Sequence, residues 1–136
     1  MVRPVTDTFY ASPQITAEAM AQLAEQGFTD VICNRPDEEN GPAEQSSEMQ
    51  KAAEAAGIKF HFHPLVHANL LDKDGIARQK ALIEGAAGNV LAYCASGNRS
   101  TVVWGLGQAG EMPANEIMDK AAGAGYDLSQ LAPMLG

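Results

Sequence analysis

Short apolar runs alternate with amphipathic stretches along the chain, which is typical of an α/β domain. Residues 28–33 are predicted to form a buried strand, and residues 90–93 are apolar without alternation, which predicts a central strand that is covered on both faces of a sheet. Residues 58–62 alternate apolar with polar side chains, so we place this strand at an edge. A further short strand is predicted over residues 8–11. The strands are therefore expected to form one sheet with a buried centre.

Helices are predicted between these strands and after the last of them, over residues 16–27, 46–57, 76–86, 99–108 and 113–124. The third of them is expected to turn Ala77, Ala81 and Leu82 inward. The Asp-x-x-Gln pattern from Asp127 predicts a capping box and a short last turn. Strand and helix therefore alternate around a central, mostly parallel sheet flanked by helices. We expect a three-layer α/β/α fold that forms a single domain over residues 1–136.

Charge and composition exclude several classes of function. The chain carries 17 acidic and 9 basic residues, a formal charge of −8, and the basic residues do not cluster. Such a surface repels nucleic acid and anionic membranes. The sequence has neither a signal-peptide pattern nor an apolar run near the ~20 residues of a membrane span. We expect a cytoplasmic protein that binds neither nucleic acid nor membrane, with Cys33 and Cys94 as free thiols.

The segment VLAYCASGNRS, residues 90–100, joins a buried strand to a helix and holds a thiol at the junction. Cys94 would lie at the carboxyl end of a central strand, where open parallel sheets place their ligand sites. The turn that follows consists of small or turn-prone residues, Ala95, Ser96, Gly97 and Asn98. Its backbone N–H groups are expected to form an anion-binding nest that contacts the substrate. Thiols at helix N-termini beside a cation have pKa values of roughly 3.5–7.5, so we expect Cys94 to be a thiolate at neutral pH.

Arg99 and Ser100 complete this candidate site. The planar fork of Arg99 suits two oxygens of a phosphate or a thiosulfate. Ser100 is expected to hydrogen-bond the sulfur of Cys94, steadying it as attacking and as leaving group. A Cys-x4-Arg spacing at a strand-to-helix turn with an internal glycine is fairly specific. These residues predict a cysteine-dependent enzyme that acts on a small anionic substrate without a cofactor.

Three segments, GFTDVICNRPDEE, AAEAAGIKFHFHPLV and VLAYCASGNRS, resemble in that order the phosphatase-like domain of the beta-lactamase-hydrolase-like (BLH) family of bacterial proteins. The similarity runs from about Phe9 to Gly107. That family is similar to a reduced dual-specificity tyrosine phosphatase, in which the cysteine forms a phosphocysteine intermediate. The resemblance implies a protein-tyrosine-phosphatase-like hydrolase with Cys94 as nucleophile. Arg99 and the N–H groups of residues 95–99 would then hold phosphate, and Ser100 would assist turnover.

The length of the loop leaves a second chemistry open. Four residues separate Cys94 from Arg99, whereas tyrosine phosphatases have five. The loop is also similar to that of rhodanese sulfurtransferases, often close to C-R-S-G-x-R-S, which carry a persulfide; Ala95 replaces a common arginine. The alternatives are therefore a sulfurtransferase with a persulfide on Cys94 and a catalytically weak oxyanion-binding module. Relatives fused to a metallo-hydrolase-type domain linked to sulfur oxidation imply a separate sulfur-metabolism protein partner.

Phosphate-ester cleavage also needs a general acid. The resemblance to dual-specificity phosphatases places it in a turn that here reads HPLVH, residues 63–67, so His67 stands at the acid position. A histidine with a pKa near 6.5 suits this role. Asp72 and Asp74 in the same loop are other candidates, and Asp37 is a weaker one. Transfer of sulfur would need no such acid.

The remaining histidines and the second cysteine could each have a functional or a purely structural role. His61 and His63 share one face of a predicted strand, but no Cys or carboxylate lies at a typical ligand spacing, so we expect no metal site. In the phosphatase arrangement the strand of Cys33 lies beside that of Cys94. A reversible disulfide between the two thiols therefore stays open beside the role of Cys33 as a small buried residue.

Overall fold

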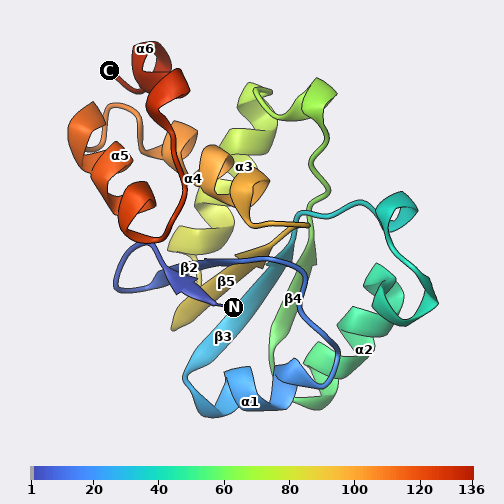
Figure 1. Ribbon diagram of the computed structural model, residues 1–136. Coiled ribbons are helices and arrows are strands. Elements are labelled where there is room, and N and C mark those ends of the chain that lie inside the picture. The colour runs from blue at the N-terminus through green and yellow to red at the C-terminus, as the bar shows by residue number, and fades with distance from the viewer. Residues whose placement is uncertain (1) are drawn as a thin grey trace.

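The computed structural model describes residues 2–136, built around a five-stranded sheet (Figure 1). The strands are β1 (Arg3–Pro4), β2 (Phe9–Ser12), β3 (Phe28–Cys33), β4 (Lys59–Phe62) and β5 (Asn89–Tyr93). Their order is β1-β2-β5-β3-β4, with only the β1–β2 pair antiparallel. The predicted central position of β5 and edge position of β4 are confirmed. Strand β1 was not predicted, because two residues carry no periodicity.

Within residues 2–136, six α-helices and four short 3-10 helices surround the sheet. The α-helices are α1 (Ala19–Glu25), α2 (Ser46–Ala55), α3 (Lys73–Glu84), α4 (Asn98–Gln108), α5 (Ala114–Gly123) and α6 (Ala132–Leu135). The 3-10 helices are η1 (Asp37–Glu39), η2 (Pro42–Glu44), η3 (His67–Asn69) and η4 (Ser129–Leu131). None of the helices within residues 2–136 is long and apolar enough to cross a membrane.

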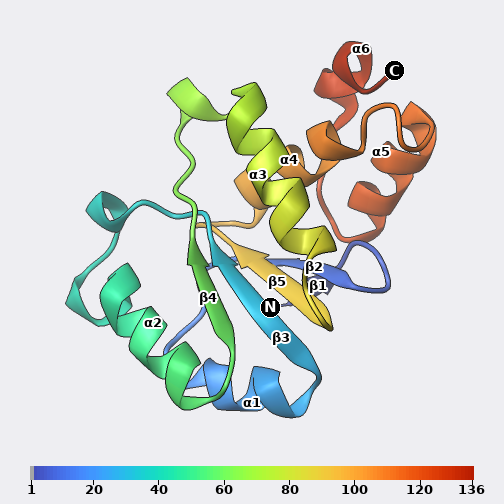
Figure 2. The ribbon, with the colours of Figure 1, turned by 180° about the vertical axis from the view of Figure 1, so that it is seen from behind.

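The helices lie in two layers, one on each face of the sheet (Figures 1 and 2). From β2 through β3 to β4 the chain moves toward one edge, and α1 and α2 cover the same face. It then returns through α3 to β5, between β2 and β3. Because parallel crossovers are right-handed, this reversal puts α3 on the opposite face, where α4 and α5 also pack. The expected three-layer α/β/α fold is confirmed.

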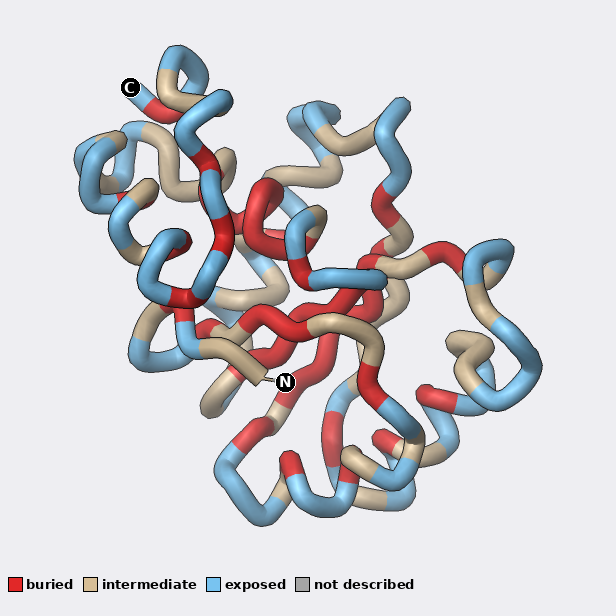
Figure 3. The backbone as a smooth tube through the Cα atoms, viewed as in Figure 1, coloured by how far each residue is buried: buried red, intermediate tan, exposed pale blue. Residues whose placement is uncertain are grey.

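Each layer has its own apolar core. On one face α1 and α2 contribute a cluster with the underside of β3 and β5: Met20, Leu23, Met49, Ala53, Val31, Leu91 and Tyr93. On the other face the C-terminal helices pack against β2 and β5 through Val102, Trp104, Ile117, Ala121, Phe9, Val90 and Ala92. Both cores meet at β5, whose residues 90–93 have no exposed surface (Figure 3). The carboxyl end of β5 is therefore rigidly placed.

Helix α3 differs most from the prediction. It begins three residues earlier than expected, at Lys73, and Ala77 and Ala81 are exposed rather than turned inward. Leu82 is only partly buried, and the fully buried residue of this helix is Gln79. The hydrophobic pattern could not find this face, because a buried glutamine is stable only when tertiary partners satisfy its amide.

Candidate functional site

The carboxyl ends of β3, β4 and β5 meet at one edge of the sheet, and Cys94 lies there, fully buried. The turn after it is exposed at Ala95 and Ser96 and enters α4 through Gly97, which has a φ of 96°. The N–H of Gly97 donates to the sulfur of Cys94 at 3.1 Å. Another N–H, that of Asn98, donates to Ser96 Oγ at 3.2 Å. The turn therefore directs a backbone donor at the thiol.

Arg99 is held by two partners far away in the sequence. Its Nη1 donates to Glu39 Oε2 at 2.9 Å and to the carbonyl of Leu65 at 2.8 Å, and its Nη2 donates to Glu39 Oε1 at 2.8 Å. Glu39 also accepts from Nε of Arg35 at 3.3 Å. Hydrogen bonds from Arg99 lower the pKa of Glu39 below its usual range, and the same pair raises the pKa of Arg99. The guanidinium is thus fixed in place and stays charged.

The way Glu39 binds leaves one edge of Arg99 for a ligand. Glu39 and Leu65 use both protons of Nη1 and one of Nη2. Within residues 2–136 neither the Nε–H nor the second Nη2–H donates to an oxygen; the neighbouring acceptor is the Cys94 sulfur, whose hydrogen bond contributes to the raised pKa of Arg99. These two donors form the side-on fork that matches two oxygens of a tetrahedral anion. The Cys94 sulfur is close enough to contribute, after Glu39, to the raised pKa of Arg99. The thiol and the free edge of the arginine therefore serve one site.

Ser100 differs from the expectation that its hydroxyl bonds the sulfur. Its Oγ donates to Asn34 Oδ1 at 2.8 Å, and a hydroxyl has only one proton to donate. Asn34 in turn donates from Nδ2 to the carbonyl of His63 at 2.8 Å. Asn34 and Gln79 also exchange two amide hydrogen bonds, at 3.0 and 2.9 Å. Ser100 thus anchors the start of α4 to a buried network that reaches β3, β4 and α3.

The same network determines the protonation of His63. The Gln79 oxygen that faces Nδ1 of His63, at 2.7 Å, can only accept, so Nδ1 carries the proton. Burial lowers the pKa of His63, which keeps the ring neutral. Its Nε2 therefore has a free lone pair, which is directed toward Gly75. His63 is therefore part of the buried network, and its Nε2 remains available to accept a hydrogen bond.

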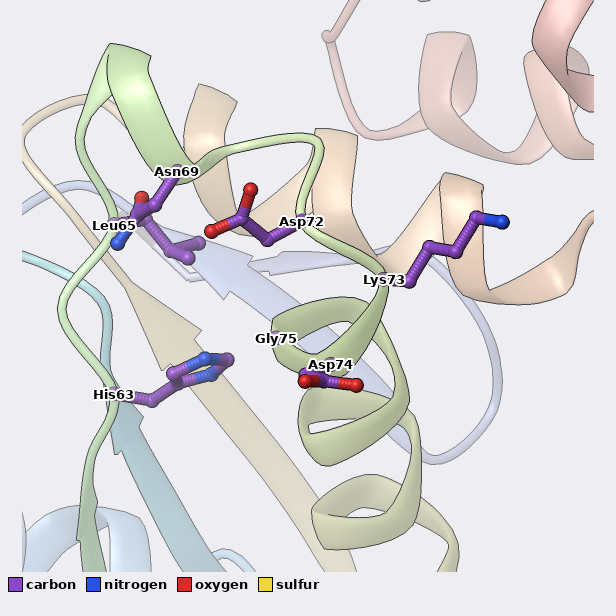
Figure 4. A pocket seen from close by; sticks show the side chains of 7 residues that line it. All are labelled: His63, Leu65, Asn69, Asp72, Lys73, Asp74 and Gly75. Atoms are coloured by element: carbon purple, nitrogen blue, oxygen red, sulfur yellow. The ribbon is translucent and has the colours of Figure 1, made fainter.

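The candidate general acids lie on the loop between β4 and α3. His67 is exposed and begins η3, two residues after the Leu65 carbonyl that holds Arg99. Asp72 and Asp74 are exposed at the start of α3. They line a cavity of about 330 Å³ together with His63, Leu65, Asn69, Lys73 and Gly75 (Figure 4). Asp37 instead caps α2, because its carboxylate accepts from the backbone N–H and the hydroxyl of Ser46.

Cys33 lies in a different environment from Cys94. Both thiols are free. The Cys33 sulfur donates to the carbonyl of Arg35 at 3.3 Å and packs in the apolar cluster beneath α1 and α2, on the same face as Tyr93. Because side chains alternate along a strand, Cys94 follows Tyr93 toward the opposite face. Burial raises the pKa of the Cys33 thiol. Its environment is that of a small buried apolar residue.

The three histidines lie in separate environments. His61 pairs with Asp30 at 2.7 Å between Nε2 and Oδ2, His63 pairs with Gln79, and His67 is exposed. Within residues 2–136 no three His, Cys, Asp or Glu side chains are grouped so as to hold a metal ion.

Several residues of the site were missed by the sequence analysis: Asn34, Glu39, Leu65, Gln79 and Tyr126. Asn34 and Glu39 lie within the ICNRPDEE stretch, whose position directly after a buried strand was a usable signal. Leu65 acts through its carbonyl, which no side-chain pattern marks. Nothing in the local sequence distinguishes Gln79 or Tyr126.

Solved structures of similar fold show which class of protein this fold belongs to. A candidate phosphatase from Neisseria meningitidis Z2491 superimposes with a TM-score of 0.84 and 33% identity, over 98% of this chain and 94% of that one. Tk-PTP in its active form superimposes with a TM-score of 0.76 and 15% identity, over 98% and 92% of the two chains, a likeness of fold. The protein therefore has a phosphatase-like fold, similar to that of Tk-PTP.

The sequence comparisons give the family. Residues 1–111 match the profile described as "Beta-lactamase hydrolase-like protein, phosphatase-like domain", and the chain belongs to this family. A beta-lactamase hydrolase-like protein of Xylella fastidiosa (strain Temecula1 / ATCC 700964) is 27% identical over 133 residues, 96% of this chain and 31% of the relative. The chain thus spans about a third of the length of that relative. The resemblance drawn from the three sequence segments is confirmed.

Proposed function

We propose that the protein is a phosphomonoester hydrolase that works through a phosphocysteine on Cys94. The observation that carries the proposal is that a backbone N–H and a guanidinium lie beside the same thiol, one to stabilise the thiolate and one to bind an oxyanion. The Gly97 N–H contacts the thiol at 3.1 Å, and Arg99, held by Glu39 and Leu65, keeps a side-on fork free for an oxyanion. The family and fold, which are phosphatase-like, support the same chemistry.

In the first step the Cys94 thiolate attacks phosphorus, so that the S–P bond forms while the ester P–O bond breaks. The fork of Arg99 and the backbone N–H groups of residues 95–99 other than those of Gly97 and Asn98 hold the non-bridging oxygens, whose charge they stabilise in the transition state. The leaving oxygen takes a proton from a general acid, a contribution typically worth about 10²–10⁴-fold. We assign this role to His67, which lies on the loop that also holds Arg99 through Leu65.

In the second step water attacks phosphorus and gives a proton to the His67 ring that was deprotonated in the first step, while the S–P bond breaks and inorganic phosphate leaves. Ser100 enters this scheme through Asn34 rather than through the sulfur. Its hydrogen bond at 2.8 Å holds the first turn of α4, and with it Arg99, against the end of β3. The substrate is a small anion, because the free donors suit one phosphoryl group.

The test uses a generic aryl phosphate with the wild-type chain and two cysteine variants. Wild-type protein is expected to release phosphate, Cys94→Ser to release none above the blank, and Cys33→Ser to keep wild-type activity as the matched control. Rapid acid quenching followed by intact-mass measurement is expected to reveal a phosphoryl adduct on Cys94. Release of phosphate that survives Cys94→Ser would refute the proposal.

The acid has its own test. His67→Ala is expected to slow the hydrolysis of esters with poor leaving groups more than of esters with good ones, since only the former need the proton. Asp74→Asn serves as the comparison on the same loop. Equal losses for both kinds of ester would remove His67 from the mechanism.

A second candidate function is transfer of sulfur through a persulfide on Cys94. Two observations favour it: the loop has four residues between Cys94 and Arg99, and the Asn98 N–H is already used by Ser96 Oγ. A loop of this kind has fewer donors for a full phosphate than a longer one. Incubation with thiosulfate separates the two functions. A gain of one sulfur that Cys94→Ser abolishes, with no release of phosphate from the aryl ester, would establish the sulfurtransferase instead. A sulfur-metabolism protein partner is predicted in that case.

A further inference from the structure

We infer that Tyr126 is a positioning residue for Cys94: its hydroxyl holds the peptide unit whose N–H contacts the sulfur. The inference rests on the proposed role of Cys94 as the reactive thiolate. Tyr126 lies between α5 and η4, beyond residues 1–111 that the family profile matches. The C-terminal helices would therefore take part in the chemistry through one phenol.

The argument begins with a single peptide bond. The carbonyl of Ser96 and the N–H of Gly97 belong to the same planar unit, and in a trans peptide they point in opposite directions. The Tyr126 hydroxyl donates to the Ser96 oxygen at 2.9 Å. On the other side, the Gly97 N–H donates to Cys94 Sγ at 3.1 Å. Holding the carbonyl outward thus keeps the N–H directed at the sulfur.

Without this hydrogen bond the peptide is free to rotate. Gly97 has a φ of 96° and no side chain to oppose rotation of the plane between it and Ser96. Rotation by half a turn would point the Ser96 oxygen at the thiolate, where two electron-rich atoms repel each other. The hydroxyl of Tyr126 therefore discriminates between a peptide orientation that stabilises the thiolate and one that destabilises it.

Tyr126 is itself well fixed, as this role requires. Its side chain is buried, and its backbone N–H donates to the Ala121 carbonyl at 2.9 Å. The guanidinium of Arg3 lies 5.8 Å from the centre of the ring and donates to the Ala124 carbonyl at 3.2 Å. The phenol is thus held between the N-terminal segment and the Cys94 loop.

Two further observations agree with this role. A Cβ built on Gly97 would overlap the Tyr126 hydroxyl, so the phenol fits the loop at van der Waals contact. Burial raises the pKa of Tyr126, with a further contribution from Cys94. The phenol therefore remains protonated, and a hydrogen-bond donor, over the range in which thiols titrate.

The experiment compares Tyr126→Phe with Tyr10→Phe, both in a Cys33→Ser background so that one thiol remains. Tyr10 packs against Phe28 in the cluster beneath α1 and α2, so its variant controls for loss of a phenol elsewhere. Thiolate formation is followed by ultraviolet absorbance against pH, and thiol reactivity by the rate of alkylation with iodoacetamide. For Tyr126→Phe, the midpoint of the titration is expected to move to higher pH. Alkylation at neutral pH is expected to slow by roughly three- to tenfold, the size of one hydrogen bond's net effect. Tyr10→Phe should change neither.

The outcomes separate this inference from the proposed function. An unchanged titration in Tyr126→Phe, or an equal change in Tyr10→Phe, overturns the inference even if the aryl phosphate is hydrolysed. A shifted titration supports it even if no phosphate is released. Amide hydrogen exchange provides a readout on the folded protein: Gly97 should exchange faster in Tyr126→Phe, while Thr101, whose N–H donates to the Gly97 carbonyl, should not. Equal protection of Gly97 in both proteins contradicts the inference.

Discussion

Replacing Asn34 with leucine removes the centre of the buried network beneath the Cys94 loop. Asn34 has no exposed surface, and its amide makes four hydrogen bonds of 2.8–3.0 Å. It accepts from Ser100 and Gln79 and donates to Gln79 and the carbonyl of His63. Leucine has the same number of side-chain heavy atoms with the same branching, so the change removes the polar partners without opening a cavity.

The expected loss of stability follows from the groups left without a partner. These are the Ser100 hydroxyl, one N–H of Gln79 and the His63 carbonyl, whereas the Gln79 oxygen keeps its bond from His63. Each unsatisfied buried group costs about 1–3 kcal/mol. With some relaxation, Asn34→Leu should destabilise the fold by roughly 3–6 kcal/mol. That is a large part of the about 5–15 kcal/mol typical of a domain.

Urea unfolding followed by the fluorescence of Trp104, the single tryptophan, measures this loss. Asn89→Leu is the matched control, because the side chain of Asn89 is half-buried and makes no hydrogen bond within residues 2–136. A loss below about 1 kcal/mol for Asn34→Leu, with an unchanged dependence on urea, would refute the reasoning.

A double-mutant cycle makes the test sharper. In the wild-type chain, Ser100→Ala removes one hydrogen bond and should cost about 1 kcal/mol. In the Asn34→Leu chain the same change removes a hydroxyl that has lost its partner, so it should be neutral or stabilising. Equal costs in both chains would show that the two side chains do not interact.

Three further predictions concern the same region. Glu39→Gln should lower phosphate release by roughly tenfold, because Arg99 loses its charged partner. Because the pKa of Glu39 is lowered, its ion pair with Arg99 stabilises the fold above the ordinary glutamate pKa of about 4.3 and loses this effect as pH falls through the lowered value. The difference in Tm between wild type and Glu39→Gln should therefore shrink on acidification. A difference that grows on acidification would contradict this reasoning. Gly97→Ala should destabilise the fold by about 2–4 kcal/mol in urea, because alanine is strained at φ 96° and overlaps Tyr126, whereas Gly41→Ala, in open space, should cost less than about 1 kcal/mol. Tyr93→Phe removes a buried hydroxyl that makes no hydrogen bond of normal geometry in the described chain, with Cys33 and Gln14 as its polar neighbours. The free energy of unfolding should therefore stay constant or rise by up to about 1 kcal/mol; a clear loss would mean that the hydroxyl is bonded to one of them.

Most of the fold was predictable because local patterns specify it. The buried strand β3 was found with its observed ends, and the alternation in β4 correctly marked an edge strand. Glycines with positive φ follow α1 and α2, where the sequence predicted these helices to end. The inward face of α3 was predicted wrongly, since hydrophobic periodicity assumes that a polar residue such as Gln79 faces water.

By itself, the sequence determined the placement of Cys94, Gly97 and Arg99, because a strand, a tight turn and a helix put neighbours in the chain around one point. Only the tertiary structure decided what holds them there. Glu39 and Asn34 reach the loop across 60 and 66 residues, and Tyr126 reaches it across 30. The strand order brings these groups together, and each acts through a single hydrogen-bonding atom. A linear pattern of apolar and polar residues predicts neither the strand order nor which single atoms form these hydrogen bonds.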